Sequence, residues 1–366
     1  MENESHRYPV SLCFETGYCP DAVIEVASRV FEAAQEGICM TDANGRIEFV
    51  NPAFTQMTGY TFEEVLGKNP RILKSGRHKH DFYRKMWQDL SQNGQWQGEI
   101  WNKRKNGEIF PEALAIHAVY NSKSEITHYF AIFSDITADM KRRKEVELGG
   151  RIQKNILRPD FVHEQLKMKS IFLPYDYLSG DSYDYRWDEE DQIFKGFLFD
   201  VMGHGIVTSL QVSALRAIFR YVVSKNISLA EKMEWLNHES IAILPDDFFA
   251  GVILFNIDLL RGTLTYCMAG INHFLLSTGQ ESGIRTVGQP GLYLGISAQE
   301  KYEEHQCPFG PGDGAIFLTD GFMDQLQEKK IPLTMDITSL MEVLNSSFFR
   351  KNLADDATAL SFTRPK

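Results

Sequence analysis

The sequence predicts an α+β protein with two domains joined by a helix. Three observations carry this prediction: Asn-Gly dipeptides between short alternating segments in the first 140 residues, a charged stretch with helical spacing, and a series of short apolar runs toward the C-terminus. Asn-Gly favours tight hairpins because both central turn residues tolerate positive φ. We therefore expect, in order, an N-terminal tail at 1–25, a small domain at 26–137, a helical linker at 138–159 and a larger domain at 160–366.

The composition excludes several classes of protein. The chain has 366 residues, with 43% hydrophobic and 24% charged, as in soluble globular proteins. A net charge of −11 argues against a nucleic-acid partner, which would need basic surface. The five cysteines form no C-x-x-C pair, which favours reduced thiols. The polar start MENESHRYPV is no signal peptide, and no charge-free apolar run approaches a membrane span of about 18 residues. We expect a cytoplasmic protein without a membrane contact.

The small domain predicts two hairpins and a further strand. "GICMTDANGRIEFVN" places two alternating segments around Asn44-Gly45, and Pro52 then starts short helical pieces. A second strand pair surrounds Asn106-Gly107, and "ITHYFAIFSDIT" is a long apolar strand. Two strands, short helices and three strands form a compact α+β unit.

This order of motifs resembles a PAS sensory domain over residues 26–137, on "TDANGRIEFVNPAFTQMTGY", "GKNPRILKSGRH", "GEIWNKRKNGEIF" and "SDIT". The resemblance implies a five-stranded antiparallel sheet with flanking helices around a pocket whose ligand is unknown. Flavin-based light sensors of this family carry a cysteine after the Asn of "GKN"; Pro70 stands there, so covalent flavin photochemistry is not expected. His78 and His80 fit a solvated loop better than haem ligands, and Cys39 fits a core position.

The linker shows a patchy apolar stripe within charged sequence. "SDITADMKRRKEVELGGRIQKNILRP" spaces apolar residues as one helix would, and Pro159 marks its end. The stretch is either a solvated connector or a short parallel coiled coil that dimerises and carries a signal. Gly149 and Gly150 each weaken a helix by about 1 kcal/mol relative to alanine, and could form a flexible joint. We expect a homodimer formed through the PAS domain and this helix.

The larger domain predicts strands grouped around a helical hairpin. Residues 209–225 place apolar side chains on one helical face, and Ser228 with Glu231 forms a capping box for a second helix. The expected strands are "MKSIFLP", "FKGFLFDV", "FAGVILFNID", "GTLTYCMA", "HFLLST", "GAIFLTDG" and "ATALSFT". This pattern favours two sheets packed face to face, with helices outside.

Five aspartates lie at the ends of these apolar runs or beside them. Asp200 and Asp320 end such runs, Asp355 and Asp356 precede one, and Asp181 lies in a glycine loop before one. A single aspartate at a strand end is usually a turn residue or a helix cap. Several together would repel one another unless a cation offsets their charge. Oxygen ligands suit Mg²⁺ or Mn²⁺, and two such ions can clamp a phosphoryl group for in-line attack.

The combination resembles the PPM-type metal-dependent protein phosphatases, and within them the bacterial SpoIIE/RsbU-like branch. The motifs are "GRIQKNILRP", "SGDSYDY", "FDVMGHG", "DDFFAGVILFNID", "YCMAGINHFLL", "LYLGI", "FLTDGFMD" and "DDATAL". The resemblance implies an α/β/β/α sandwich with two Mn²⁺ or Mg²⁺ ions. It makes Asp200 the bridging ligand beside the Val201 backbone carbonyl, and Asp181, Asp320 and Asp355 complete the metal shells with Asp356 in support.

The same resemblance implies catalytic roles for Asp200 and Asp181. His204 is a candidate general acid, although its register differs from the family's Asp-Gly-His-Gly, and a loop-packing or solvent-facing histidine is the alternative. Ile271 and Phe274 depart from the branch's usual Ala-Gly-His-Asn-Pro turn, which we expect to lie apart from the metal aspartates.

The function implied is that of a PAS-regulated serine/threonine protein phosphatase. By family analogy, its substrate is a phosphorylated STAS-type anti-sigma-factor antagonist in a partner-switching stress pathway. Two alternatives stay open: a non-catalytic adaptor that binds a phosphoprotein, and a sensor that acts mainly through ligand or redox binding in the PAS pocket.

Overall fold

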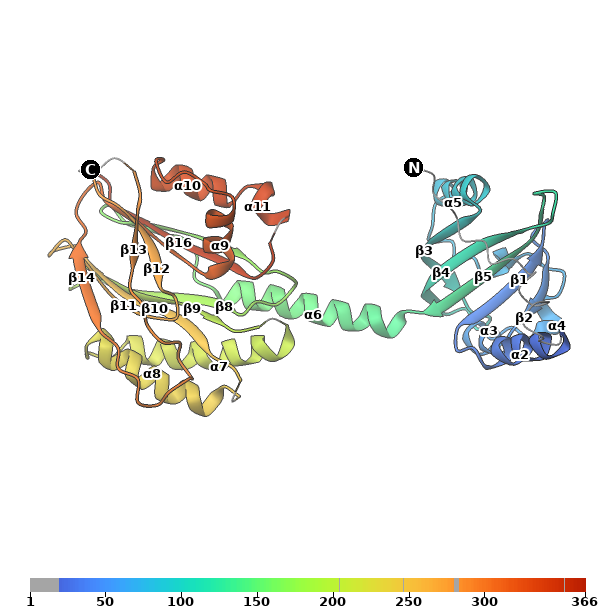
Figure 1. Ribbon diagram of the computed structural model, residues 1–366, viewed down its shortest axis with the longest axis horizontal. Helices are drawn as coiled ribbons and strands as arrows, with labels where there is room; N and C mark the ends of the chain where they lie inside the picture. The colour runs from blue at the N-terminus through green and yellow to red at the C-terminus, as the bar shows by residue number, and fades with distance from the viewer. Residues whose placement is uncertain (1–19, 204, 246, 280–282, 352) are drawn as a thin grey trace. The chain divides into compact units, whose positions relative to one another are not determined.

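The computed structural model describes residues 20–203, 205–245, 247–279, 283–351 and 353–366. The chain divides into two compact units, with the boundary between Arg143 and Lys144 (Figure 1).

The N-terminal unit is an antiparallel sheet flanked by helices, as the sequence predicts. The strand order is β2-β1-β5-β4-β3. Its elements are α2 (Pro20–Ala33), β1 (Gly37–Asp42), β2 (Ile47–Val50), α3 (Pro52–Thr58), α4 (Phe62–Val65), η1 (Pro70–Leu73), α5 (His80–Asn93), β3 (Gln95–Lys103), β4 (Ile109–Tyr120) and β5 (Ile126–Asp135). Both Asn-Gly sites join paired strands, and Gly45 and Gly107 have φ of 74° and 93°. Helix α2 begins at Pro20, so part of the predicted tail is helical.

The linker is one continuous helix, α6 (Thr137–Ile156), with no break at its two glycines. A Cβ on Gly150 would lie 1.9 Å from the Tyr177 carbonyl oxygen, whereas a Cβ on Gly149 would meet only Leu178 Cδ2 at 3.4 Å. Gly150 therefore allows a close approach of helix and loop. The interpretation of the glycine pair as a joint is not supported.

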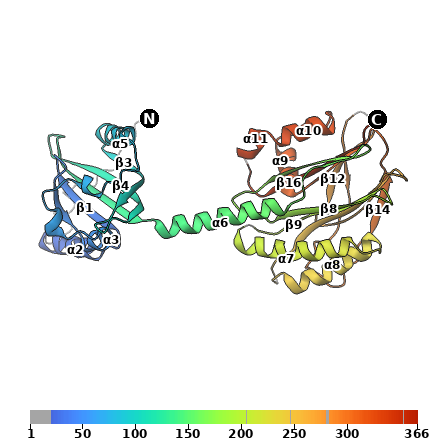
Figure 2. The same cartoon turned by 180° about the vertical axis from the view of Figure 1, so that it is seen from behind.

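The C-terminal unit contains two antiparallel sheets with helices on both outer faces (Figures 1 and 2). The sheet orders are β14-β11-β10-β9-β8 and β13-β12-β15-β16-β7-β6. The strands are β6 (Phe161–Val162), β7 (Lys167–Leu173), β8 (Asp181–Asp188), β9 (Ile193–Val201), β10 (Ala250–Asp258), β11 (Thr263–Ala269), β12 (His273–Ser277), β13 (Arg285–Gly288), β14 (Glu304–Pro308), β15 (Gly314–Leu318) and β16 (Ala357–Thr363). The helices are α7 (Ile206–Val223), α8 (Leu229–Ile243), α9 (Asp320–Glu328), α10 (Ile337–Leu344) and α11 (Ser347–Lys351).

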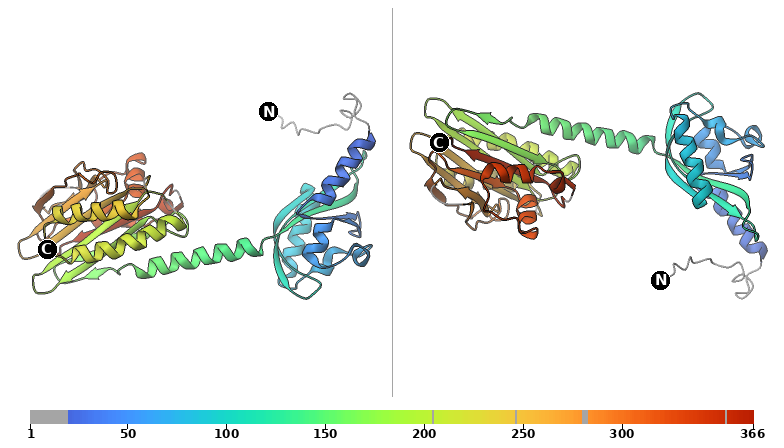
Figure 3. Two further views of the ribbon diagram at one scale, coloured as in Figure 1. Left: turned by 90° about the horizontal axis from the view of Figure 1, so that it is seen from below. Right: turned by 90° about the horizontal axis from the view of Figure 1, so that it is seen from above.

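Three apolar clusters hold these four layers together. Phe255 of one sheet packs against Phe317 and Phe362 of the other, with ring centroids 4.8 and 5.1 Å apart. Helices α7 and α8 lie side by side over the first sheet (Figure 3). Phe219 of α7 packs against Phe199 of β9, with the ring centroids 4.8 Å apart. Helices α9 and α10 cover the second sheet. The predicted α/β/β/α sandwich is therefore correct.

Helix α7 is the one helix among the described residues that is long and apolar enough to cross a membrane. It carries Arg216 and Arg220, and buries Val212, Leu215 and Phe219 against the sheet. These are the properties of a core helix in a sandwich.

Candidate metal centre

Asp181 and Asp200 are direct neighbours across two paired strands. Asp181 is the first residue of β8 and Asp200 the penultimate residue of β9, and the two are cross-strand partners. The expectation that Asp181 lies in a loop is corrected, because the strand begins at this residue. Its side chain is fully buried, and its Oδ1 has no hydrogen-bond partner among the described residues.

Asp320 reaches the same corner from the second sheet. It opens α9 directly after β15, with Thr319 as the N-cap residue. The Thr319 hydroxyl donates to Asp181 Oδ2 at 2.9 Å and accepts from the Thr358 backbone N–H at 2.8 Å. Thr319 therefore joins three distant segments at one point. The sequence analysis missed this residue, although it precedes Asp320 in "FLTDG".

Asp356 holds a loop of the backbone. Its two carboxylate oxygens accept hydrogen bonds from the backbone N–H groups of Tyr175 and Gly180, both at 2.7 Å. Asp355 Oδ1 in turn accepts from the Asp356 backbone N–H at 2.8 Å. Asp356 thus orders the segment that leads into Asp181, and the geometry favours a supporting role.

Glycine permits the close backbone contacts at this corner. A Cβ on Gly180 would lie 2.6 Å from the Val201 carbonyl oxygen and 2.9 Å from that of Gly203. The Val201 backbone N–H donates to the Gly180 carbonyl at 3.1 Å. The Val201 carbonyl, the candidate backbone ligand, therefore lies against the chain segment that carries Asp181.

Tyr293 is a second residue that the sequence analysis missed. The charges of Asp320 and Asp200 contribute, after burial, to a raised pKa of the Tyr293 phenol. Its ring covers Gly270, and a Cβ on Gly251, the strand partner of Asp200, would contact both Ile271 and Tyr293. The turn at Ile271 thus adjoins the aspartate corner, contrary to expectation.

The carboxylates raise one another's pKa values. Burial is the main cause for Asp181 and Asp200, and the charges of neighbouring aspartates add to it. Burial and then the charge of Asp355 raise the pKa of Asp320, which shares a hydrogen bond with Asp200. Burial likewise raises the pKa of Asp356. Without a cation this corner therefore favours protonated carboxyls.

The donor set fits Mg²⁺ or Mn²⁺. It contains only oxygen atoms, which hard divalent cations prefer, and one carboxylate oxygen of Asp181 is buried without a donor. Over the described part of the chain, however, no three His, Cys, Asp or Glu side chains converge as a finished cage.

His204 lies outside the described residues, so its candidate role stays a prediction. The glycines on either side have φ of 91° and 92°. The preceding Met202 and the following Ile206 are exposed.

Two family models match separate parts of the chain. Residues 35–138 match the PAS domain family, and residues 196–364 match the family of Stage II sporulation protein E (SpoIIE). A nitrogen fixation regulatory protein of Klebsiella oxytoca is 35% identical over 129 residues, or 34% of this chain and 26% of the relative. The phosphoserine phosphatase RsbP of Bacillus subtilis is 25% identical over 191 residues, or 50% of this chain and 46% of the relative. This chain thus spans less than half of either relative.

Among solved structures, the SiaA-PP2C domain of Pseudomonas aeruginosa is 20% identical, covers 62% of this chain and 99% of its own, and has a TM-score of 0.47. The chain joins a PAS domain to a PPM phosphatase domain of the SpoIIE family.

Proposed function

We propose that the C-terminal unit is a divalent-metal-dependent phosphatase for phosphoserine or phosphothreonine in proteins, and that the PAS domain governs it. The observation that carries this proposal is the cross-strand pairing of the buried Asp181 with Asp200, to which Asp320 of the second sheet is hydrogen-bonded. The relative named as a phosphoserine phosphatase supports the substrate class.

In the proposed mechanism, two Mn²⁺ or Mg²⁺ ions would be held by Asp200 as the central ligand, with the Val201 carbonyl, Asp181, Asp320 and Asp355 as the other candidate ligands. The bound ions would lower the pKa of an attacking water and neutralise phosphoryl charge. Thr319 orients Asp181 through its hydroxyl hydrogen bond. Asp356 orders the loop before Asp181 by accepting hydrogen bonds from two backbone N–H groups. Thr319 and Asp356 would therefore position the metal ligands without taking part in the reaction.

The proposed substrate is a phosphorylated STAS-type anti-sigma-factor antagonist, taken by analogy with the partner-switching branch of the family. The proposed assembly is a homodimer through the PAS domain and α6. Leu148, Ile152 and Ile156 support it, since they lie four residues apart on α6 and are at least 50% exposed.

The first experiment is hydrolysis of p-nitrophenyl phosphate by the full chain with Mn²⁺, with Mg²⁺ and with chelator. We expect metal-dependent turnover that Asp200→Asn lowers at least about 100-fold. Asp191→Asn, in the exposed β8–β9 turn, is the matched control and should keep full activity.

A phosphoserine-containing protein substrate is the second arm of the experiment. Mn²⁺ binding without turnover of either substrate would overturn the phosphatase assignment and favour the non-catalytic adaptor. Turnover of the small ester alone would overturn only the protein-substrate claim.

A further inference from the structure

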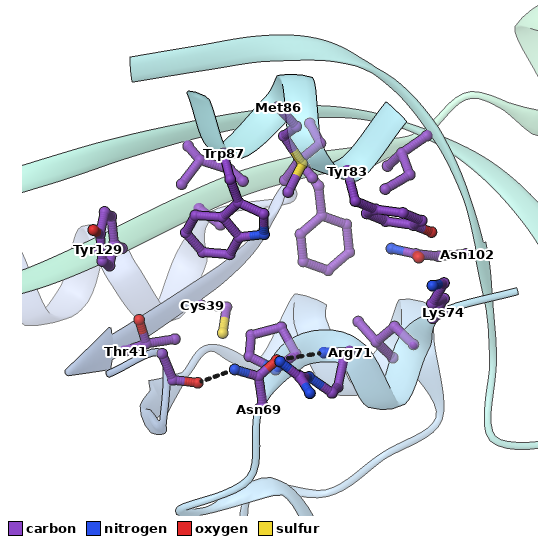
Figure 4. A pocket seen from close by; sticks show the side chains of 18 of the residues that line it. Cys39, Thr41, Asn69, Arg71, Lys74, Tyr83, Met86, Trp87, Asn102 and Tyr129 are labelled. Atoms are coloured by element: carbon purple, nitrogen blue, oxygen red, sulfur yellow. Dashed lines mark hydrogen bonds between the residues drawn. The ribbon is translucent and has the colours of Figure 1, made fainter. Parts of the chain in front are cut away.

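The N-terminal unit encloses a cavity of about 750 Å³ that is lined by strands of the sheet, with α5 and η1 on opposite sides of it (Figure 4). This volume lies within the range of about 300–1,000 Å³ usual for small-molecule sites. Phe133, Leu114 and Ile100 contribute to a largely apolar inner wall. Nothing in the phosphatase mechanism uses this space.

One polar pair lies at the buried side of the cavity. Asn102 on β3 donates from Nδ2 to Glu112 Oε1 on β4 at 2.7 Å. Glu112 is only 2% exposed, and its Oε2 has no hydrogen-bond partner among the described residues. A buried oxygen left without a partner lowers the stability of the folded state, so a group bound in the cavity that donates a hydrogen bond to it would remove that cost.

The solvent side of the cavity is cationic. Arg71 and Lys74 line it and are exposed. Arg71 donates only to the neutral Asn69 side chain, and the Lys74 ammonium lies 4.4 Å from the centre of the Tyr83 ring. Glu112 is the sole acidic residue among the lining residues described, so no lining carboxylate offsets these charges.

Aromatic side chains also line the cavity. Figure 4 shows Trp87 and Tyr83 of α5 facing the cavity from the side opposite Cys39 and Asn69. Trp87 is 46% exposed, and its ring meets that of Tyr129 edge to face at 5.9 Å. Such walls favour a flat molecule, because aromatic faces stack on rings with little loss of entropy.

We propose that this cavity binds a flat, largely apolar organic anion, which places a hydroxyl or amide group against Glu112 and a carboxylate, sulfonate or phosphate group against Arg71 and Lys74. The inner group satisfies Glu112 Oε2, the ring fills the apolar middle, and the anion meets the cationic rim. None of the candidate metal ligands is among the residues that line this cavity.

The test uses three fluorescent probes and the full chain. 6-Hydroxynaphthalene-2-sulfonate has the hydroxyl, the flat ring and the anion; naphthalene-2-sulfonate lacks the hydroxyl, and 2-naphthol lacks the anion. We expect the first probe to bind about 3- to 10-fold more tightly than either of the others, measured by titration, because each removed group loses one polar interaction.

Variants of the lining residues test the two proposed polar contacts separately. Arg71→Gln with Lys74→Gln should weaken the two sulfonates and leave 2-naphthol unchanged, whereas Lys123→Gln, an exposed lysine outside the cavity, should change nothing. In Glu112→Leu, the two sulfonates should bind equally well. Equal binding of all three probes to the wild type, or no binding below 1 mM (~4 kcal/mol), would overturn the proposal. If Glu112→Leu does not fold, the comparison of the three probes and the Arg71 and Lys74 variants still tests the proposal.

Discussion

At the scale of single residues, both units contain buried carboxyl groups. Asp181 in the phosphatase domain and Glu112 in the PAS domain each have one buried oxygen without a partner among the described residues. Such groups cost stability in the free protein and are typical of sites that bind something. One prediction tests the metal centre, and a second tests Glu112.

The first prediction concerns the metal centre. With chelator present, Asp200→Asn should unfold at a temperature no lower than the wild type, because asparagine removes the cost of burying an ionisable carboxyl beside other aspartates. With excess Mn²⁺ the wild type should gain roughly 5 °C or more, and the variant almost nothing. Differential scanning fluorimetry measures both. An equal Mn²⁺ shift in the two proteins would contradict the assignment of Asp200 as a ligand.

The second prediction concerns Glu112, whose pKa burial raises to about 8 from 4.5. The folded state therefore holds a proton that the unfolded state has lost. The free energy of unfolding of the PAS domain should fall by up to roughly 5 kcal/mol as the pH rises from about 4.5 to 8, and it should stay constant above pH 8. Glu112→Gln should remove this decline.

Hydrogen exchange of β3 and β4 peptides, as the ratio of wild type to variant at each pH, measures the change. The ratio cancels the intrinsic pH dependence of exchange. A ratio that stays constant across this pH range would show that Glu112 titrates normally.

At the scale of elements, α6 is attached to the loop that precedes Asp181. Gln153 exchanges two hydrogen bonds with the Ser179 backbone, at 2.7 and 2.9 Å. Arg216 of α7 donates to the Ile156 carbonyl and to Asp184, both at 2.7 Å. A change in α6 therefore has a direct covalent and hydrogen-bonded route to a candidate metal ligand.

The third prediction uses the two glycines of α6 as a matched pair. Gly149→Ala should stabilise the helix by about 0.5–1 kcal/mol and leave activity intact, because its Cβ finds ordinary contact. Gly150→Ala should displace the Tyr177 carbonyl and lower phosphatase activity at least about 10-fold, since small misplacements at a catalytic site are costly. Steady-state rates with thermal unfolding measure both, and equal activities would show that this contact does not position the site.

At the scale of the whole molecule, the exposed stripe of α6 predicts self-association. The fourth prediction is that Leu148→Glu with Ile152→Glu converts a dimer to a monomer, because charges replace apolar side chains in the coiled-coil seam. Lys144→Glu, an exposed position of the same helix, is the control. Sedimentation velocity gives the mass. A wild-type chain that sediments as a monomer, or a dimer that survives both charges, would contradict the role of this stripe.

The sequence by itself determined the local elements and the choice of fold. The hairpins at Asn44-Gly45 and Asn106-Gly107, the Ser228–Glu231 capping box and β16 depend on nearby residues, and all lie where they were predicted. The aspartate candidates could be named because each ends or precedes an apolar run. Their number and order, with the family resemblance, indicated the PPM sandwich.

Only the tertiary structure decided how these residues meet. Thr319 joins Asp181 to β16, Asp356 holds the loop before Asp181, and Tyr293 covers the turn opposite Asp200. The partners of these contacts lie far apart in the chain, so residue spacing does not predict which of them will meet. For the same reason, the sequence did not predict the close approach at Gly150 or the Asn102–Glu112 pair. Packing of distant segments, rather than local preference, sets the burial and the charge environment on which the chemistry depends.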